Sequence, residues 1–341
     1  MGERKKFDLN RDNLSLRLSF RGDVVGDYAE RGKSAIILLS SIFIIINLFG
    51  QIPEIKWQHC YGTNELDRVM CISEAEQGYM IGLTIYSGGP GISNFHGGAD
   101  AWILNINSSG NIIWERCYGG SNGEQCEKIL KSSNNEFYLL GGSNSLDGDI
   151  SCDTNYGSSD FWIVKINGEG DIPWDHCYGS LTTDEMQDAV LTPDGGLLFM
   201  GRIFYNGGDV QNWYGSYDVW FCKIDSLGTI EWEKTVGNQT LDNGISMQLI
   251  SDTSFAFIGG YDDPGGMIDC EIAVSGFYSD EYLVEMSLAE GDILNIYCYG
   301  GSGNDLGFYF EKLDDGYIFA AYTNSYDGDV SGFHGGSDIW V

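Results

Sequence analysis

The sequence predicts an all-β fold built from one repeated unit of four short strands, and three observations lead to that prediction. A segment of the form W-x-x-C/T-Y/V-G starts at Trp57, Trp114, Trp174 and Trp232, and N-I-Y-C-Y-G starts at Asn295. The intervals between these starts are 57, 60, 58 and 63 residues. A second motif keeps the same interval, and no stretch of ten or more residues has helical spacing. Such a period indicates one supersecondary unit whose apolar face is buried only by its neighbours.

The second motif has the form D-x-W and opens a strand in each repeat. It occurs as A-D-A-W-I at 99, S-D-F-W-I at 159, Y-D-V-W-F at 217, D-E-Y-L-V at 280 and S-D-I-W-V at 337. In the copy that starts at Asp100, the residues alternate and are rich in β-branched and aromatic side chains, which predicts a strand. Gly110 can take the positive φ that a hairpin turn needs. The strands predicted for this repeat cover residues 100–107, 112–118, 126–131 (the weakest) and 137–141.

Glycine residues mark the turns and the crowded places of this pattern. Glycine makes up 48 of the 341 residues, about twice its usual share, as many tight turns require. A glycine near the end of the fourth strand recurs where backbones are expected to crowd together. It stands at positions Gly82, Gly141, Gly201 and Gly259, with Ala320 in the last copy.

Four short antiparallel strands in about 60 residues are the unit of a β-propeller blade. A β-solenoid would use shorter coils, and a string of β-sandwiches would need about 100 residues per unit. About five repeats are present, and the last one stops at Val341, inside a strand that continues in earlier copies. Two interpretations follow. Either residues 337–341 pair back onto the first repeat and complete a five-bladed ring, or the reading frame is truncated from a protein of six to eight blades.

The repeat resembles a known family. Residues 100–121, D-A-W-I-L-N-I-N-S-S-G-N-I-I-W-E-R-C-Y-G-G-S, are similar to the seven-bladed β-propeller repeat (SBBP) family of secreted bacterial proteins. Residues 325–341, S-Y-D-G-D-V-S-G-F-H-G-G-S-D-I-W-V, resemble the variant found in exported Bacteroidetes proteins. The resemblance covers Trp57 to Val341 and implies a propeller fold and an extracellular setting. It implies no reaction, because propellers carry many unrelated activities.

The N-terminal region divides into two segments ahead of the repeats at 51–341. Residues 1–33 are a polar extension, which we expect to be disordered or to result from a start codon assigned too far upstream. Residues 34–50 contain a mainly apolar run of fifteen residues, from Ala35 to Phe49, behind Arg31 and Lys33. This length fits a signal peptide better than a membrane-spanning helix, which needs about 20 residues. We therefore expect export to the cell surface or beyond, with membrane contact only if the segment is retained as a signal anchor.

The nine cysteines do not form an obvious disulfide framework. Four of them occupy equivalent places in four repeats, and equivalent places in successive blades should be far apart. They are Cys60, Cys117, Cys177 and Cys298. The sequence therefore favours buried small apolar side chains over disulfides. Pairing of neighbouring strands through Cys60–Cys71 and Cys117–Cys126 stays open as the alternative.

The chain is strongly acidic. Its formal charge is −32, and residues 51–341 hold 10 Lys and Arg against 44 Asp and Glu. Such a surface repels phosphate backbones, which excludes nucleic acid as a partner. It suits cations and basic or neutral partners, and it keeps a glycine-rich β protein soluble.

Two acidic loops are candidate calcium sites. Asp147 and Asp149, and likewise Asp327 and Asp329, flank a glycine just before a D-x-W strand. Carboxylates two residues apart can face one hard cation such as Ca²⁺, but the full ligand set of an EF-hand is missing. The alternative is a turn in which aspartate binds local backbone N–H groups. Apart from Ca²⁺, the sequence implies no cofactor.

The aspartates that open the D-x-W strands recur as well: Asp100, Asp160, Asp218 and Asp338, with Glu281 in the remaining copy. A catalytic acid breaks the symmetry of a repeat, because one site needs one special residue. These residues follow the symmetry. We therefore expect each to hold the turn of its own blade by accepting backbone N–H bonds, and we assign no catalytic residue.

Aromatic residues outside the repeated positions are candidate ligand-binding residues. They lie in loops before the D-x-W strands: Trp213, Tyr214, Phe277 and Tyr278. Exposed aromatic rings beside carboxylate and amide groups would suit stacking on sugar rings.

These features favour a non-enzymatic binding or adhesion scaffold at the cell surface, with a glycan or protein ligand. The first alternative is a polysaccharide-active enzyme at the mouth of the propeller channel, which would show two carboxylates from non-equivalent repeat positions. The second is a quinoprotein-like scaffold, since G-x-I-x-W at 228–232 resembles the repeats of those proteins. The adjacent cysteine pair of many such enzymes is missing.

Overall fold

The computed structural model describes residues 55–132, 135–152, 156–261, 267–268, 270 and 280–341. The chain separates into two units, 1–56 and 57–341, and every strand found among the described residues lies in the second. In the described ranges no helix is long and apolar enough to cross a membrane. The predicted signal segment and two of the candidate aromatic residues, Phe277 and Tyr278, lie outside the described residues.

The second unit consists of five antiparallel sheets that follow one another along the chain. The first sheet is formed by β1 (Asp67–Ala75), β2 (Gly78–Ile85), β3 (Asp100–Asn107) and β4 (Ile112–Tyr118). The second is formed by β5 (Glu124–Lys131), β6 (Glu136–Ser143), β7 (Asp160–Asn167) and β8 (Trp174–Tyr178). The third is formed by β9 (Asp184–Leu191), β10 (Leu197–Ile203), β11 (Asp218–Ile224) and β12 (Ile230–Val236).

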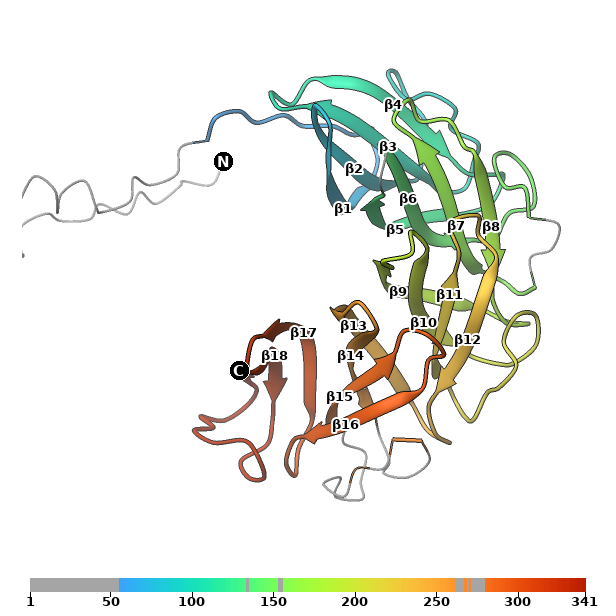
Figure 1. Ribbon diagram of the computed structural model, residues 1–341. Coiled ribbons are helices and arrows are strands. Elements are labelled where there is room, and N and C mark those ends of the chain that lie inside the picture. The colour runs from blue at the N-terminus through green and yellow to red at the C-terminus, as the bar shows by residue number, and fades with distance from the viewer. Residues whose placement is uncertain (1–54, 133–134, 153–155, 262–266, 269, 271–279) are drawn as a thin grey trace, which may run out of the picture. The chain divides into compact units, whose positions relative to one another are not determined.

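The fourth sheet is formed by β13 (Asp242–Ser251), β14 (Ser254–Tyr261), β15 (Asp280–Ser287) and β16 (Ile293–Tyr299). The fifth has three strands, β17 (Asp305–Leu313), β18 (Gly316–Thr323) and β19 (Asp338–Trp340). Within the second unit the sheets are arranged along an arc, with the first strand of each sheet on its inner side (Figure 1). This is the predicted β-propeller of four-stranded antiparallel blades.

The period of the sequence and the sheets are offset from each other. Each four-stranded sheet ends with a W-x-x-C/T-Y/V-G strand or its variant, namely β4, β8, β12 or β16. The four strands predicted between residues 100 and 142 therefore belong to two sheets, β3 and β4 to the first and β5 and β6 to the second. Strand β19 pairs with β18. The described residues therefore do not show residues 337–341 paired with the first repeat.

Each first strand carries a β-bulge near its start, and in the second, third and fourth sheets a glycine of the next strand pairs with the residue before the bulge. In the second sheet Cys126 pairs with Gly141 and Lys128 pairs with Leu140, so Glu127 is the extra residue. A Cβ on Gly141 would lie 1.8 Å from the carbonyl oxygen of Gln125. In this sheet only glycine lets the two backbones approach so closely, as the sequence predicted. The places predicted in the first and last copies, Gly82 and Ala320, are wrong by one residue, because Leu83 and Ala321 pair at the equivalent position.

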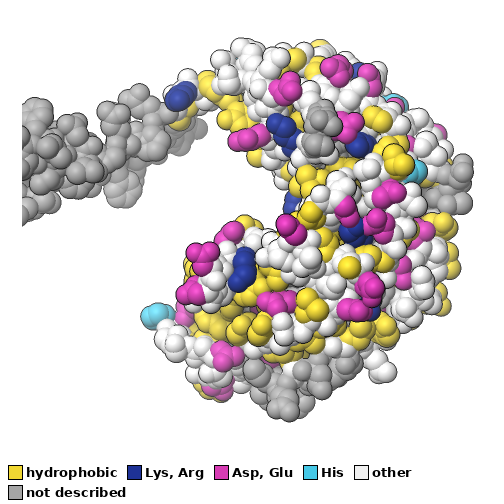
Figure 2. All heavy atoms as spheres, viewed as in Figure 1, with side chains coloured by type: hydrophobic (Ala, Val, Ile, Leu, Met, Phe, Trp, Pro, Cys, Tyr) yellow, Lys and Arg dark blue, Asp and Glu magenta, His cyan; other side chains and the backbone are white. Residues whose placement is uncertain are grey.

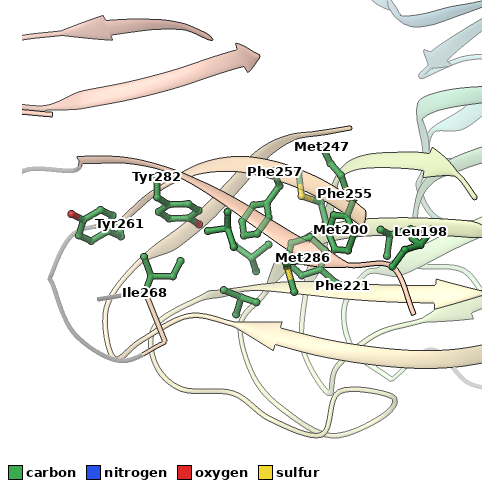
Figure 3. Packing of buried hydrophobic residues seen from close by; sticks show 14 of the residues in the cluster. Leu198, Met200, Phe221, Met247, Phe255, Phe257, Tyr261, Ile268, Tyr282 and Met286 are labelled. Atoms are coloured by element: carbon green, nitrogen blue, oxygen red, sulfur yellow. The ribbon is translucent and has the colours of Figure 1, made fainter. Parts of the chain in front are cut away.

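Buried apolar side chains fill the space between successive sheets. Between the third and fourth sheets, Phe221 of β11 packs on Phe257 of β14 with ring centroids 4.7 Å apart (Figure 3). Met200, Met286 and Tyr282 join the same cluster. Each sheet thus covers the apolar face of its neighbour, which is the packing that the repeat predicts.

The expectation of buried, unpaired cysteines is confirmed for Cys117 but is wrong for Cys60, which is exposed, and for Cys177 and Cys298, which form disulfides. The structure contains Cys152–Cys177 and Cys270–Cys298. The suggested pairs Cys60–Cys71 and Cys117–Cys126 are wrong, since these four cysteines are free. The reason is geometric: in each disulfide a loop before the D-x-W strand approaches the W-x-x-C-Y-G strand of the same sheet, and neither suggested pair joins these two elements.

Candidate functional site

The repeated aspartates hold the turns before the D-x-W strands, as predicted. The side chain of Asp100 accepts the backbone N–H of His96 at 2.8 Å, and Asp160 accepts that of Tyr156 at 2.7 Å. In the fourth sheet the equivalent residue is Asp280, which opens β15, and Glu281 follows it. The expectation that Glu281 takes this place is therefore wrong by one residue.

A second carboxylic acid faces each of these aspartates from the next sheet, and we call each such pair a blade junction. The pairs are Asp100–Glu124, Asp160–Asp184, Asp218–Asp242 and Asp280–Asp305. At the second junction, a Cβ on Gly179 would lie 2.2 Å from Asp184 Oδ2 and 3.3 Å from Asp160 Oδ1. Both oxygens therefore border the same small space. Oδ1 of Asp160 is buried there without a hydrogen-bond partner in the described part of the chain.

Burial changes the acidity of these groups. It raises the pKa of Asp160 to about 6 and that of Asp184 to about 7, and the charge of Asp160 contributes to the second shift. Burial likewise raises the pKa of Asp218 to about 6 and that of Asp280 to about 7. Two buried carboxylates in such proximity do not both ionise readily. The junctions thus have a structural role that depends on protonation, and their recurrence argues against a single catalytic site.

The two acidic loops lie beside the first and fourth junctions. Asp147 Oδ1 accepts the N–H of Ser121 at 2.7 Å, and Asp149 Oδ2 accepts that of Gly119 at 3.4 Å. Asp327 and Asp329 make the same contacts with the N–H groups of Ser302 and Gly300, at 2.7 and 3.3 Å.

No group of three or more His, Cys, Asp or Glu side chains in the described ranges is arranged to hold a metal ion. The backbone N–H bonds that the aspartates of both loops accept favour their turn-forming role. Calcium binding by these loops stays a prediction.

The two candidate aromatic residues that the structure describes, Trp213 and Tyr214, have different surroundings. The Trp213 ring packs against Tyr205 with centroids 5.1 Å apart and lies against the core between the second and third sheets. Tyr214 uses its backbone N–H to bind Asp218, and its side chain is exposed. Their binding role also stays a prediction.

The inner side of the arc is where the repeats differ. We define the inner rim as two positions of each first strand, its second residue and its bulge residue. They are Arg68 and Met70, Gln125 and Glu127, Glu185 and Gln187, Asn243 and Ile245, and Leu306 and Phe308. Charge, polarity and size change from sheet to sheet at these positions. A binding site needs such unlike side chains, whereas the blade junctions repeat theirs.

A cavity of about 580 Å³ lies at this rim between β5 and β9. Four rim side chains, Gln125, Glu127, Glu185 and Gln187, contribute to its lining, together with Asn144, Thr183 and Ser159. None of its lining residues is basic. A smaller hollow of about 400 Å³ shares Asn144 with it and is bordered by Asp147. Amide, hydroxyl and carboxylate groups of this kind can both donate and accept hydrogen bonds.

Two of the three carboxylates that line the cavity, Glu127 and Glu185, have different surroundings. Glu185 forms an ion pair with Arg202, at 2.7 Å between oxygen and nitrogen. Burial raises the pKa of Glu127, and the positive charge of Arg68 opposes that shift. Glu127 is a bulge residue and Glu185 a second residue, so the two come from non-equivalent positions of the repeat.

Sequence reasoning missed the rim residues. Their strand was the weakest of the four predictions, since it shows little apolar alternation in the stretch E-Q-C-E-K-I-L-K. A signal was nevertheless present: aligned on the acid that opens each first strand, the repeats differ most at the next few residues. The second residue changes from Arg68 to Gln125, Glu185, Asn243 and Leu306.

Comparison with known proteins finds solved structures that are similar to much of this chain at low sequence identity. No protein-family model and no curated protein sequence matches the chain. An apocarotenoid oxygenase from Synechocystis is similar over 76% of this chain, with 8% identity and a TM-score of 0.40. The match spans 56% of that oxygenase, less than two thirds of its length. A hydrazine synthase from Kuenenia stuttgartiensis is similar over 79% of this chain and 77% of its own, with 12% identity and a TM-score of 0.37.

Proposed function

We propose that this chain is an exported, cell-surface β-propeller that acts as a non-enzymatic binding scaffold, with a glycan or another neutral polar ligand at the inner rim. The single observation that carries the proposal is the cavity between β5 and β9, whose lining includes four of the rim side chains that do not repeat. Its amide and carboxylate groups match the hydrogen-bonding pattern of sugar hydroxyls.

The charge of the molecule supports a neutral or basic ligand. Acidic side chains are spread over the visible face, and basic ones are few (Figure 2). The lining of the cavity itself includes Glu127, Glu185 and Asp184 but no lysine or arginine. Anionic polymers are therefore poor candidates, because their charges would be repelled.

The setting of the function belongs to the same proposal. The motifs D-x-W and W-x-x-C-Y-G resemble the SBBP repeats of exported Bacteroidetes proteins. The apolar segment Ala35–Phe49 has the length of a signal sequence. Both features support export to the cell surface, where a scaffold for glycans or proteins would act.

The binding proposal can be tested with a carbohydrate array. The full chain should bind at least one neutral glycan, and the double variant Gln125→Ala, Gln187→Ala should lose that signal. Gln77→Ala is the matched control, because Gln77 lies in an exposed turn outside the rim. A blank array across neutral polysaccharides would count against the proposal, as would equal binding by the double variant.

A second function, cleavage of a glycosidic bond, is favoured by two of the three carboxylates that line the cavity, Glu127 and Glu185. Glu127, whose pKa is raised by burial, would donate its proton to the glycosidic oxygen as the bond from that oxygen to the anomeric carbon breaks. Glu185 would take a proton from the water whose oxygen bonds to the same carbon. Two carboxylates with different surroundings are the usual means of these two tasks.

An assay for cleavage products distinguishes the second function from the first. If the site is catalytic, the glycan that binds best should be shortened on incubation, and Glu127→Gln should bind it but release no new reducing ends. Glu76→Gln, in an exposed turn, serves as the control. A bound glycan that the native chain leaves intact would exclude this function and leave the binding scaffold standing.

A further inference from the structure

Two cysteines that belong to neighbouring sheets lie with their thiols side by side. Cys71 is part of β1 in the first sheet and Cys126 is part of β5 in the second, and their Sγ atoms are 3.9 Å apart. Neither forms a disulfide; Cys126 is buried and Cys71 is half-buried. The two positions are 55 residues apart in the sequence. The packing of the two sheets, and not a local turn, therefore brings the thiols together.

The neighbouring strand leaves room for both sulfur atoms. Gly82 of β2 is the residue that pairs with Cys71. A Cβ on Gly82 would lie 2.6 Å from the Sγ of Cys71 and 2.8 Å from the Sγ of Cys126. These distances are too short for a carbon atom beside a sulfur atom. The absence of a side chain at Gly82 thus holds open the space in which the two thiols meet.

The pair is not part of the repeated scaffold. Cys71 follows the bulge residue of its strand, and Cys126 precedes the bulge residue of its own. At the next three boundaries between sheets these two places are held by Lys128 and Met186, by Asp188 and Gly244, and by Ser246 and Gly307. No cysteine stands at any of them. The dithiol thus breaks the symmetry of the repeat, as the inner rim does.

The two thiols differ in acidity and in access. The hydrogen bond between them lowers the pKa of Cys71, although burial opposes this shift. The same hydrogen bond, together with burial, raises the pKa of Cys126. Cys71 therefore becomes a thiolate first, with the Cys126 thiol as its hydrogen-bond donor, and it is also the more accessible of the two. Because the thiolate is the form that attacks a disulfide, Cys71 is suited to react first.

We propose that Cys71 and Cys126 form a redox-active dithiol that reacts with small-molecule disulfides and closes to a disulfide bond between the first and second sheets. In the first step the Cys71 thiolate attacks one sulfur of the small disulfide, whose S–S bond breaks, and one small thiolate leaves. Cys126 then loses its proton, and its sulfur attacks Cys71 Sγ and displaces the second small thiolate. The protein loses two electrons and two protons, and the small disulfide takes them up as two thiols.

The bond would lie beside the cavity at the inner rim. Gln125 and Glu127, the residues on either side of Cys126, both line that cavity. A bond at Cys126 would hold this wall of the cavity to the first sheet, whereas each disulfide already present lies within one sheet. Since the bond joins residues 55 apart, it would also restrict the unfolded chain and so stabilise the folded one.

The experiment is to incubate the folded full-length chain with oxidised glutathione and to map its disulfides without reductant. All forms carry Cys60→Ser, because the exposed Cys60 thiol would react by itself. Cleavage after Arg116 and after Glu124 places Cys71, Cys117 and Cys126 on separate peptides. The proposal predicts that the peptides of Cys71 and Cys126 become joined and carry no glutathione. Peptides that stay separate after incubation would overturn it.

Single variants distinguish the attacking thiol from the second one. Cys126→Ser should retain one glutathione on Cys71, because no second thiol displaces it. Cys71→Ser should leave Cys126 unmodified, because that thiol is buried. Cys222→Ser is the matched control, since Cys222 is a buried free cysteine outside the pair, and it should still form the bond. Glutathione on Cys126 in Cys71→Ser, with Cys71 unmodified in Cys126→Ser, would contradict the assigned order.

Gly82→Ala tests the geometry with both thiols in place. Its new Cβ should turn the two sulfur atoms away from each other, so the bond should form several times more slowly than in the parent chain. Equal rates would contradict the role of the space at Gly82. Oxidation should also raise the melting temperature of the parent chain by a few degrees and leave that of Cys71→Ser unchanged. A fully bonded chain that melts no higher would contradict the stabilising link between the sheets.

Discussion

The blade junctions and the inner rim lie at the start of the same strands but follow opposite rules. Asp184 opens β9, and an acidic residue stands at the equivalent place of every other junction: Glu124, Asp242 and Asp305. Asp184 and the next residue, Glu185, both line the cavity, but Glu185 has a different counterpart in each sheet. Within a repeat protein, positions that must fit a neighbouring copy stay alike, whereas positions that face a ligand are free to differ. Positions that keep the same kind of residue in every repeat therefore indicate the scaffold, and positions that differ between repeats indicate the binding site.

The largest expected effect comes from breaking the repeated packing between the sheets. Trp220 is fully buried between the second and third sheets, and its indole also donates to Glu233. Trp220→Ala should lower the free energy of unfolding by about 3–5 kcal/mol, because it leaves a cavity and an unpaired acceptor. Chemical denaturation measures this. Leu227→Ala, at an exposed hairpin, should stay within about 0.5 kcal/mol, and an equal loss there would contradict the packing scheme.

The next effect is the dependence of stability on pH at the junctions. The folded-state pKa of Asp184, about 7, lies above the unfolded value of about 3.9. Folding therefore favours the protonated group, so its contribution is complete below about pH 4 and is lost as the pH rises through 7. The melting temperature should fall between pH 5 and pH 8, through this group and through Asp160, whose pKa is about 6.

Asp160→Asn sharpens that prediction. The new amide cannot ionise, its oxygen can keep the bond from Tyr156, and its N–H₂ group can donate toward Asp184 across Gly179. The variant should melt above the native chain at pH 8, with a smaller difference at pH 5. Asp225→Asn is the control, and it should change stability in the opposite direction. Backbone N–H groups of the exposed hairpin, above all that of Thr229, bind the Asp225 carboxylate and lower its pKa. A native melting temperature that rises from pH 5 to pH 8 would refute the junction scheme.

A smaller effect is expected at the rim. Gln125→Ala and Gln187→Ala remove side chains that line the cavity rather than the core. Each should change the free energy of unfolding by no more than about 0.5 kcal/mol. Thermal and chemical unfolding of both variants would show this. A loss of several kcal/mol at either position would mean that the rim, like the junctions, is part of the scaffold.

The smallest effect concerns calcium. Because Asp147 and Asp149 already accept backbone N–H bonds, excess calcium should shift the melting temperature by less than about 1 °C. Calorimetry with and without a chelator measures the shift. A clear stabilisation by calcium that disappears in Asp147→Asn would instead establish the acidic loops as cation sites.

Much of the fold could be predicted from the sequence, because local pattern determines local structure here. The bounds predicted for β3 and β4, 100–107 and 112–118, agree with the structure. Glycines at the turns and alternating β-branched residues in the strands predict these hairpins directly. The offset of the sheets was not predictable in this way, because a period shows the length of a unit but not where a sheet begins. The disulfides were missed for a related reason: Cys152 and Cys177 meet only after the loop has folded over the sheet.

The candidate site could be predicted only in part. The repeated aspartates were interpreted as turn-forming from their symmetry, and His96 N–H bound to Asp100 confirms it. The rim residues were missed, because Glu127 and Gln187 occupy bulges that no periodicity in the sequence reveals. Which side chains line the inner side depends on how the sheets pack, and that is a property of the assembled unit rather than of one strand.

The most direct test of the account is hydrogen–deuterium exchange of the full chain with and without the neutral glycan that binds best on the array. The account predicts new protection in the first strands β5 (Glu124–Lys131) and β9 (Asp184–Leu191), with the outer strands β8 and β12 unchanged. Protection confined to the outer strands, or to the loop that carries Trp213 and Tyr214, would contradict it and place binding outside the inner rim.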